Sequence, residues 1–131
     1  MSITVKSRKQ KARKLQNLVA KNISKLLNIP WGKDKDIQGR EMGQIGTDVK
    51  LYGKALELFP FSVEAKWQEN WSVHGWIDQA KENLIDGTDW LLCCKRNRED
   101  PIIIIDAEVF FKIYKYALKG GYKFENNKKL S

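Results

Sequence analysis

Cysteine and histidine are scarce in this sequence, and their placement excludes several kinds of site. The 131-residue chain has two cysteines, the neighbours Cys93 and Cys94, and one histidine, His74. Adjacent cysteines form neither an ordinary disulfide framework nor the spaced pairs of a zinc site, so we expect two buried, reduced thiols. Histidine is often a general base, but we expect His74 to be a surface residue at the start of a helix.

Long apolar runs are also absent. No stretch approaches the roughly 20 apolar residues of a membrane-spanning helix, and the basic N-terminus lacks the apolar segment of a signal peptide. With 42% hydrophobic and 31% charged residues, the composition is that of an ordinary globular protein. We therefore expect one soluble, cytoplasmic domain spanning residues 1–131, with no membrane partner.

Acidic residues are missing from the first part of the chain. Residues 1–33 contain nine of the 24 Lys and Arg residues and none of the 16 Asp and Glu residues, so the net charge of +8 is concentrated at this end. Clustered positive charge binds nucleic-acid phosphates by releasing counterions. Nucleic acid is thus the first partner to consider, although composition alone equally allows a solvated basic helix or a contact with acidic surfaces.

Hydrophobic periodicity predicts three helices. Residues 7–28 place apolar side chains on one face and lysines and arginines over the rest, which predicts a basic amphipathic helix. A second helix is expected over residues 74–85, with four residues facing inward: Trp76, Ile77, Ala80 and Leu84. Asp106 can cap a third, aromatic helix that ends at Gly120, and we expect residues 120–131 to be frayed.

Period-two alternation predicts the strands. Residues 61–68 alternate without a break, so one face turns apolar residues to the core. The other face presents what we call the polar row: Ser62, Glu64, Lys66 and Gln68. A short strand is expected at residues 47–51, another is possible near Ile37 in a mostly irregular segment, and residues 90–94 and 102–105 form a hairpin of two buried strands. This order of elements predicts an α/β fold with a central mixed sheet flanked by helices.

Two positions of the polar row carry chemistry. Glu64 and Lys66 place a carboxylate and an ammonium side by side, and Asp48 converges on Glu64 if the strands at 47–51 and 61–68 are adjacent. Carboxylates and the Ala65 carbonyl are hard oxygen ligands that suit Mg²⁺, which can activate water and neutralise a phosphate during phosphodiester hydrolysis. A Glu and a Lys two positions apart are also commonly an exposed ion pair, so the spacing alone is a weak signal.

In context these residues resemble the PD-(D/E)XK nucleases, through Gly46-Thr47-Asp48 followed by Val63-Glu64-Ala65-Lys66. The element order is similar to that family across nearly the whole chain. The resemblance implies a restriction-endonuclease-like fold, a site for Mg²⁺ or Mn²⁺ on Asp48, Glu64 and Ala65, and Lys66 at the water or the scissile phosphate. It also implies catalytic roles for Gln68 and for Gln79 on the following helix.

The sequence departs from that family at two positions. Thr47 stands where the motif's name has proline, a position that varies in the family. Gln16 stands where the family's first helix often offers a glutamate to the metal. An amide is a poorer metal ligand than a carboxylate, so the resemblance implies one metal ion more firmly than two.

Within the family, the small size, the basic first helix and the Lys95-Arg96 pair are most similar to Holliday-junction resolvases and their phage-encoded relatives. We therefore expect an endonuclease that cuts branched DNA during recombination. A repair or restriction-type nuclease acting on linear DNA and a non-catalytic DNA-binding protein are the alternatives. The expected DNA contacts are Lys11, Arg13, Lys14, Arg40, Lys95 and Arg96. A solvated turn explains the last two equally well.

A four-way junction needs two matched nicks, and the resolvases that the chain resembles act as homodimers, so we expect a homodimer. The aromatic surplus of five Trp, five Phe and four Tyr offers material for an interface. Trp67 and Trp76 are expected to pack in the core or in the dimer. The candidates for the interface are Trp71, Phe110, Phe111 and Tyr114, because neighbouring Phe110 and Phe111 cannot both face the core of their own subunit.

Overall fold

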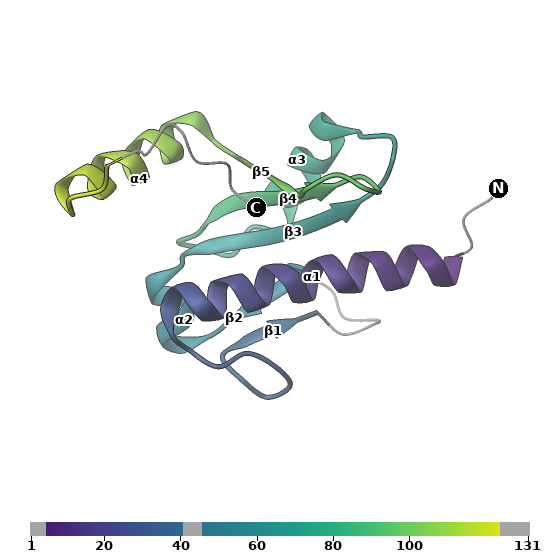
Figure 1. The fold of residues 1–131 in the computed structure, drawn as a ribbon, viewed down its shortest axis with the longest axis horizontal. Helices are drawn as coiled ribbons and strands as arrows, with labels where there is room; N and C mark the ends of the chain where they lie inside the picture. Colours follow the sequence, from purple (N-terminus) through teal and green to yellow (C-terminus); the bar gives the residue numbers. More distant parts are fainter. Residues whose placement is uncertain (1–4, 41–45, 124–131) are drawn as a thin grey trace.

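The computed structural model describes residues 5–40 and 46–123 (Figure 1). In chain order the elements are α1 (Val5–Leu27), β1 (Ile37–Gly39), β2 (Val49–Leu51), α2 (Gly53–Leu58), β3 (Phe61–Trp67), α3 (Val73–Glu82), β4 (Asp89–Lys95), β5 (Ile102–Ile105) and α4 (Ala107–Lys119). The strands form one sheet in the order β1-β2-β3-β4-β5, in which only β3 and β4 are parallel. The predicted α/β fold with a central mixed sheet and flanking helices is confirmed. The short helix α2 was not predicted.

One apolar face of α1 packs on the sheet, chiefly over β1 and β3. Its buried apolar residues are Leu15, Val19, Ala20 and Ile23. Their three-and-four spacing is what predicted the helix. Because only this face is covered, the lysines and arginines of α1 remain on its outer surface.

The central strand β3 is buried on both sides. Val63 and Ala65 belong to the core beneath α1. On the opposite face, Trp76 and Ala80 of α3 pack against Leu92 of β4 and its neighbours. Two layers of helix therefore enclose β3, so that the first part of the polar row lies in the protein interior rather than on a solvated face.

The two cysteines of β4 are free and buried, as the sequence predicts. Burial raises the pKa of the Cys93 thiol to about 12 and that of Cys94 to about 11, so both stay protonated at neutral pH. Among the described residues, every helix is too short or too polar to cross a bilayer.

Two predictions about burial are wrong. β5 was expected to be a buried strand, but it is the edge of the sheet, and Ile102 and Ile103 are exposed. Leu84 was expected to face the core, but α3 ends at Glu82 and Leu84 is exposed. Fraying was expected from about residue 120, where the N–H of Gly121 donates to the carbonyl of Leu118 after the end of α4. Residues 124–131 of the predicted tail lie outside the described part.

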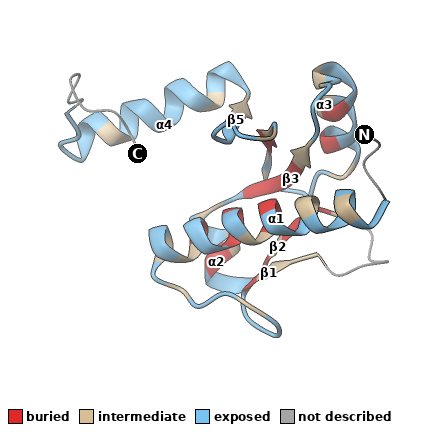
Figure 2. Cartoon of the chain, turned by 45° about the vertical axis from the view of Figure 1, so that its right-hand side comes forward, coloured by how far each residue is buried: buried red, intermediate tan, exposed pale blue. Residues whose placement is uncertain are grey.

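The last helix is also more exposed than an ordinary core helix. None of the residues of α4 is fully buried, and it extends away from the sheet after β5 (Figure 2). Val109 is the residue of α4 that packs, partly buried, against the main core.

Candidate active site

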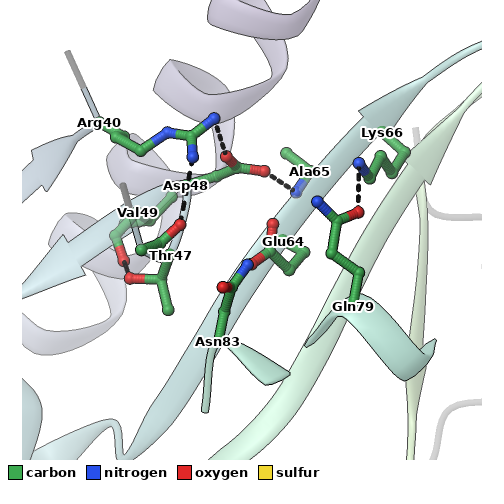
Figure 3. A network of polar contacts seen from close by, with 10 residues as sticks. Arg40, Thr47, Asp48, Val49, Glu64, Ala65, Lys66, Gln79 and Asn83 are labelled. Atoms are coloured by element: carbon green, nitrogen blue, oxygen red, sulfur yellow. Dashed lines mark hydrogen bonds and ion pairs between the residues drawn. The ribbon is translucent and has the colours of Figure 1, made fainter. Parts of the chain in front are cut away.

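Asp48 and Glu64 are brought together because β2 and β3 are neighbours (Figure 3). The Asp48 N–H donates to the carbonyl of Val63 at 2.8 Å, and its Oδ2 accepts from the Ala65 N–H at 2.8 Å. Asp48 and Glu64 are only 4% and 2% exposed. Main-chain hydrogen bonds thus fix a buried carboxylate beside the middle of β3.

Burial, and after it the nearby charge of Asp48, raise the pKa of Glu64 from 4.5 to about 7. Two groups act in the opposite direction. Asn83 Nδ2 donates to Glu64 Oε1 at 3.0 Å, and the charge of Lys66 favours the ionised form. Glu64 therefore holds its proton to a higher pH than a solvent-exposed glutamate does.

Lys66 is held by α3. Its Nζ donates to Oε1 of Gln79 at 2.9 Å, so the two residues that the sequence placed in one site are in direct contact. Asn83 lies one helical turn beyond Gln79 and reaches Glu64. Sequence reasoning missed Asn83, although its spacing of four from Gln79 puts both amides on one helix face.

Arg40 lies in the site rather than on an outer DNA-binding surface. Its Nη2 is 3.1 Å from Asp48 Oδ1, and its Nη1 donates to the carbonyl of Gly46 at 3.2 Å. The sequence placed Arg40 only among the DNA contacts. In the structure the guanidinium of Arg40 also offsets the charge of Asp48. The separation of the two residues in the sequence did not predict this second role.

A cleft of about 570 Å³ opens in front of these groups. Its lining comes from α1, from the segment before β2, from the end of β3 and from the β4–β5 turn, and includes Asp48, Ala65 and Lys66. Five cations line it: Arg8, Lys9, Lys11, Arg40 and Lys66. Two carboxylates, Asp48 and Glu69, line it as well. The excess of positive charge gives a cleft that attracts anions.

The predicted DNA contacts of α1 divide around this cleft. Lys11 lines it, whereas Arg13 and Lys14 are exposed on another part of the helix. Arg8 and Lys9, which the sequence analysis did not select, line the cleft instead. Positions 8, 12 and 16 lie one helical turn apart and share one face of α1. Gln16 is buried, and this burial identifies the face of α1 that lines the cleft, which the sequence alone did not indicate.

The β4–β5 turn forms the opposite rim. Lys95 Nζ lies 4.6 Å from the centre of the Trp67 ring, and the Arg96 guanidinium lies 4.9 Å from that of Trp71. Trp67 Nε1 also donates to Asn97 Oδ1 at 2.8 Å. These contacts tie the turn to the loop after β3. The ammonium of Lys95 donates to turn carbonyls, so part of its role is to shape the turn.

The other predicted residues lie at the edges of the site. Gln68 follows the end of β3, is exposed, and lines the cleft beyond Lys66. Gln16 is buried and lines the cleft from α1. The hydroxyl of Thr47 donates to the carbonyl of Val49 and is buried. His74 is exposed, as expected.

The donor set fits a hard divalent cation. Asp48 and Glu64 supply carboxylate oxygens, and the Ala65 carbonyl lies on the Asp48 side because the N–H and C=O of a strand residue point toward the same edge. Within residues 5–40 and 46–123, no group of three or more His, Cys, Asp or Glu side chains comes together. Two carboxylates and a carbonyl suit Mg²⁺, which binds few protein ligands and keeps several waters.

The fold and the cleft define an α/β protein with a buried carboxylate pair behind a basic cleft. Comparison with protein-family models, with curated proteins and with solved structures finds no significant match. The likeness to PD-(D/E)XK nucleases therefore stays a prediction from the motif residues.

Proposed function

We propose that this protein is a metal-dependent endonuclease of the PD-(D/E)XK type that hydrolyses phosphodiester bonds in DNA. One observation carries the proposal: Asp48 and Lys66 line a cleft whose wall is basic, with the buried Glu64 directly behind them. A phosphate in this cleft would meet cations on α1, a lysine on β3 and the carboxylates at the same time.

Each residue has a role that follows from its contacts. Asp48, Glu64 and the Ala65 carbonyl would hold Mg²⁺, or Mn²⁺ in its place, and the bound ion would supply charge neutralisation and an acidified water. Lys66, oriented by Gln79, would donate to the attacking water or to a phosphate oxygen. Asn83 orients Glu64 through its 3.0 Å hydrogen bond.

The proposed substrate is branched DNA. Lysines and arginines of α1 line the described cleft, while Lys95, at the end of β4, and Arg96 lie over the rings of Trp67 and Trp71. Contacts from such residues to phosphates position a nucleic acid without reading its sequence. We therefore expect selection by DNA shape, and paired nicks at a four-way junction would need two copies of the chain.

A second candidate is a DNA-binding protein without catalysis. The ion pair between Arg40 and Asp48 favours it, because this contact gives the carboxylate a purely structural partner. Metal-dependent cleavage separates the two functions.

The test is incubation of the purified protein with labelled four-way junctions, flaps, duplexes and single strands, with Mg²⁺ or with chelator. We expect metal-dependent cutting, preferentially of the junctions, which is lost in Glu64→Ala, Asp48→Ala and Lys66→Ala without loss of folding. Glu82→Ala, at an exposed glutamate of α3, is the matched control and should cut normally. Binding without cutting by the wild type would support the second candidate, and wild-type activity of Glu64→Ala would remove Glu64 from the site.

A further inference from the structure

The helix α4 exposes an apolar surface that its own subunit does not cover. Its lysines, Lys112, Lys115 and Lys119, recur at helical spacing on one side. The remaining arc is apolar and aromatic, yet its large side chains are exposed, with Phe111 at 68% and Leu118 at 56%. A helix with this pattern normally buries its apolar arc against another element.

The sheet has a matching uncovered face. On the side of α1, that helix packs chiefly on β1 and β3, makes fewer contacts with β2 and β4, and leaves β5 largely uncovered. Beside it runs an apolar groove of about 420 Å³. Its floor is formed by Leu91 and Cys93, which are already buried, and by Ile103 and Ile105 of the edge strand, of which Ile103 is exposed. Leu18 and Leu26 of α1 form one wall. The subunit's own α4 reaches this groove only through Ile113.

The exposed area is large enough for an interface. Eight large apolar side chains of β5, α4 and the turn that follows are between 37% and 68% exposed: Ile103, Phe110, Phe111, Ile113, Tyr114, Tyr116, Leu118 and Tyr122. At roughly 100 Å² each they expose roughly 800 Å², compared with about 800 Å² per partner in a standard interface and roughly 300–600 Å² in the largest patch of a typical monomer.

We infer that a second copy of the chain covers this surface, and that α4 of each copy lies in the groove between α1 and β5 of the other. An unpartnered apolar helix and an apolar groove occur on the same chain, so a dimer with two-fold symmetry buries both apolar surfaces in each copy. Exchange is favoured over self-docking because α4 begins after β5 and extends away from its own sheet (Figure 1), and it lines its own groove only through Ile113. The lysine side of α4 then faces solvent.

The homodimer that the proposed function requires would form through this surface. Only the biological role of the dimer rests on the proposed function. The register pairs Lys66 with Cys94 and Cys94 with Ile102, which places the cleft at one end of the sheet. Ile105, where the chain turns into α4, pairs with Leu91 toward the other end. The interface therefore leaves both clefts open to DNA. Trp71, which the sequence suggested for the interface, lies on the cleft side instead.

Sedimentation equilibrium and light scattering of the full chain test the inference. At micromolar concentration the wild type should have about twice the 15.2 kDa chain mass. Phe111→Glu, on the helix, and Ile103→Glu, in the groove, should each weaken dimerisation at least 100-fold. Leu58→Glu, at a residue 49% exposed on α2, is the matched control and should remain dimeric. Circular dichroism of each variant checks that the subunit is folded.

The remaining outcomes overturn the inference. A monomeric wild type would mean that the groove takes the chain's own α4 or no helix at all, and a monomer that co-sediments with anionic lipid vesicles through Phe111 would assign the surface to a membrane. A dimer that survives both substitutions would place the interface elsewhere. The fate of the proposed function is separate. Glu64→Gln should dimerise normally, whereas a wild-type dimer without nuclease activity would contradict the proposed function and leave this inference standing.

Discussion

Replacing Glu64 by glutamine is expected to stabilise the metal-free protein at neutral and alkaline pH. The carboxyl group is buried next to Asp48, and this environment raises its pKa from 4.5 to about 7. Ionising Glu64 therefore costs more in the folded protein than in the unfolded chain. Glutamine has the same shape, can still accept the hydrogen bond from Asn83, and carries no charge.

The size and the pH window of the effect follow from that rise in pKa. Below the unfolded pKa of 4.5 the carboxyl is protonated in both states and has no effect on the free energy of unfolding. As pH increases toward 7, stability is lost because the unfolded chain releases the proton first, and above about 7 the full loss is present. A rise from 4.5 to about 7 corresponds to roughly 3 kcal/mol, which for a chain of this length is roughly 10 °C in Tm.

Thermal unfolding in chelator from pH 4.5 to 9 measures the effect. The Tm of the wild type should fall relative to that of Glu64→Gln as pH increases, and the two curves should approach one another near pH 4.5. Glu82→Gln, which makes the same chemical change at an exposed position, should follow the wild type. Parallel curves for the wild type and Glu64→Gln, or a less stable Glu64→Gln protein at pH 8, would refute the reasoning about this carboxyl pair.

Two further predictions concern DNA binding, measured by fluorescence anisotropy without cleavage. In Ca²⁺, Arg40→Gln should bind DNA about tenfold more weakly than the wild type, because a cation on Asp48 frees the guanidinium of Arg40 for a phosphate. In chelator Arg40 stays paired with Asp48, so the loss of affinity should be less than about threefold. Equal losses in both conditions would contradict the idea that Arg40 leaves Asp48 for the phosphate. Neutralising the three cleft-facing bases of α1 should lower the slope of log affinity against log salt by about one per charge that contacts a phosphate. These bases are Arg8, Lys9 and Lys11. The control variant, neutralised at Arg13 and Lys14, should keep the wild-type slope, and the opposite result would move the DNA to the outer face of the helix.

Local patterns predicted the elements of this fold other than α2, but not the exposure of β5 and α4. The residues of α1 and β3 repeat with the period of a helix and of a strand, so both elements were predictable from side-chain spacing alone. The four isoleucines of β5 are typical of a buried strand, but whether a strand is buried depends on which helix covers it, and α1 ends its coverage before β5. The same limit applies to α4, whose apolar arc has no partner within the described chain.

The candidate site was predictable to the extent that it follows from strand geometry. Glu64 and Lys66 share a face because they are two residues apart, and Asp48 reaches them because β2 pairs with β3. The contact between Arg40 and Asp48 depends instead on how β1 and β2 align, which no local pattern specifies. Asn83 follows the last residue of α3, where a short amide in the sequence indicates only the end of a helix.

The polar row of β3 gives a stability argument for placing function at Glu64. Ser62 shares a hydrogen bond with Thr88, and Lys66 donates to Gln79, so these neighbours of Glu64 in the row have neutral partners that satisfy them. Indeed no buried side-chain nitrogen or oxygen in the described residues lacks a partner. Glu64 differs because one of its close neighbours, Asp48, is a like charge that opposes its ionisation. An amide at position 64 would keep the hydrogen bond with Asn83 and avoid a loss of roughly 3 kcal/mol, so the carboxyl is unfavourable for folding alone. A divalent cation between the two carboxylates removes this penalty, since it favours the ionised form of both, and this supports the proposed metal site more directly than the spacing of the motif does.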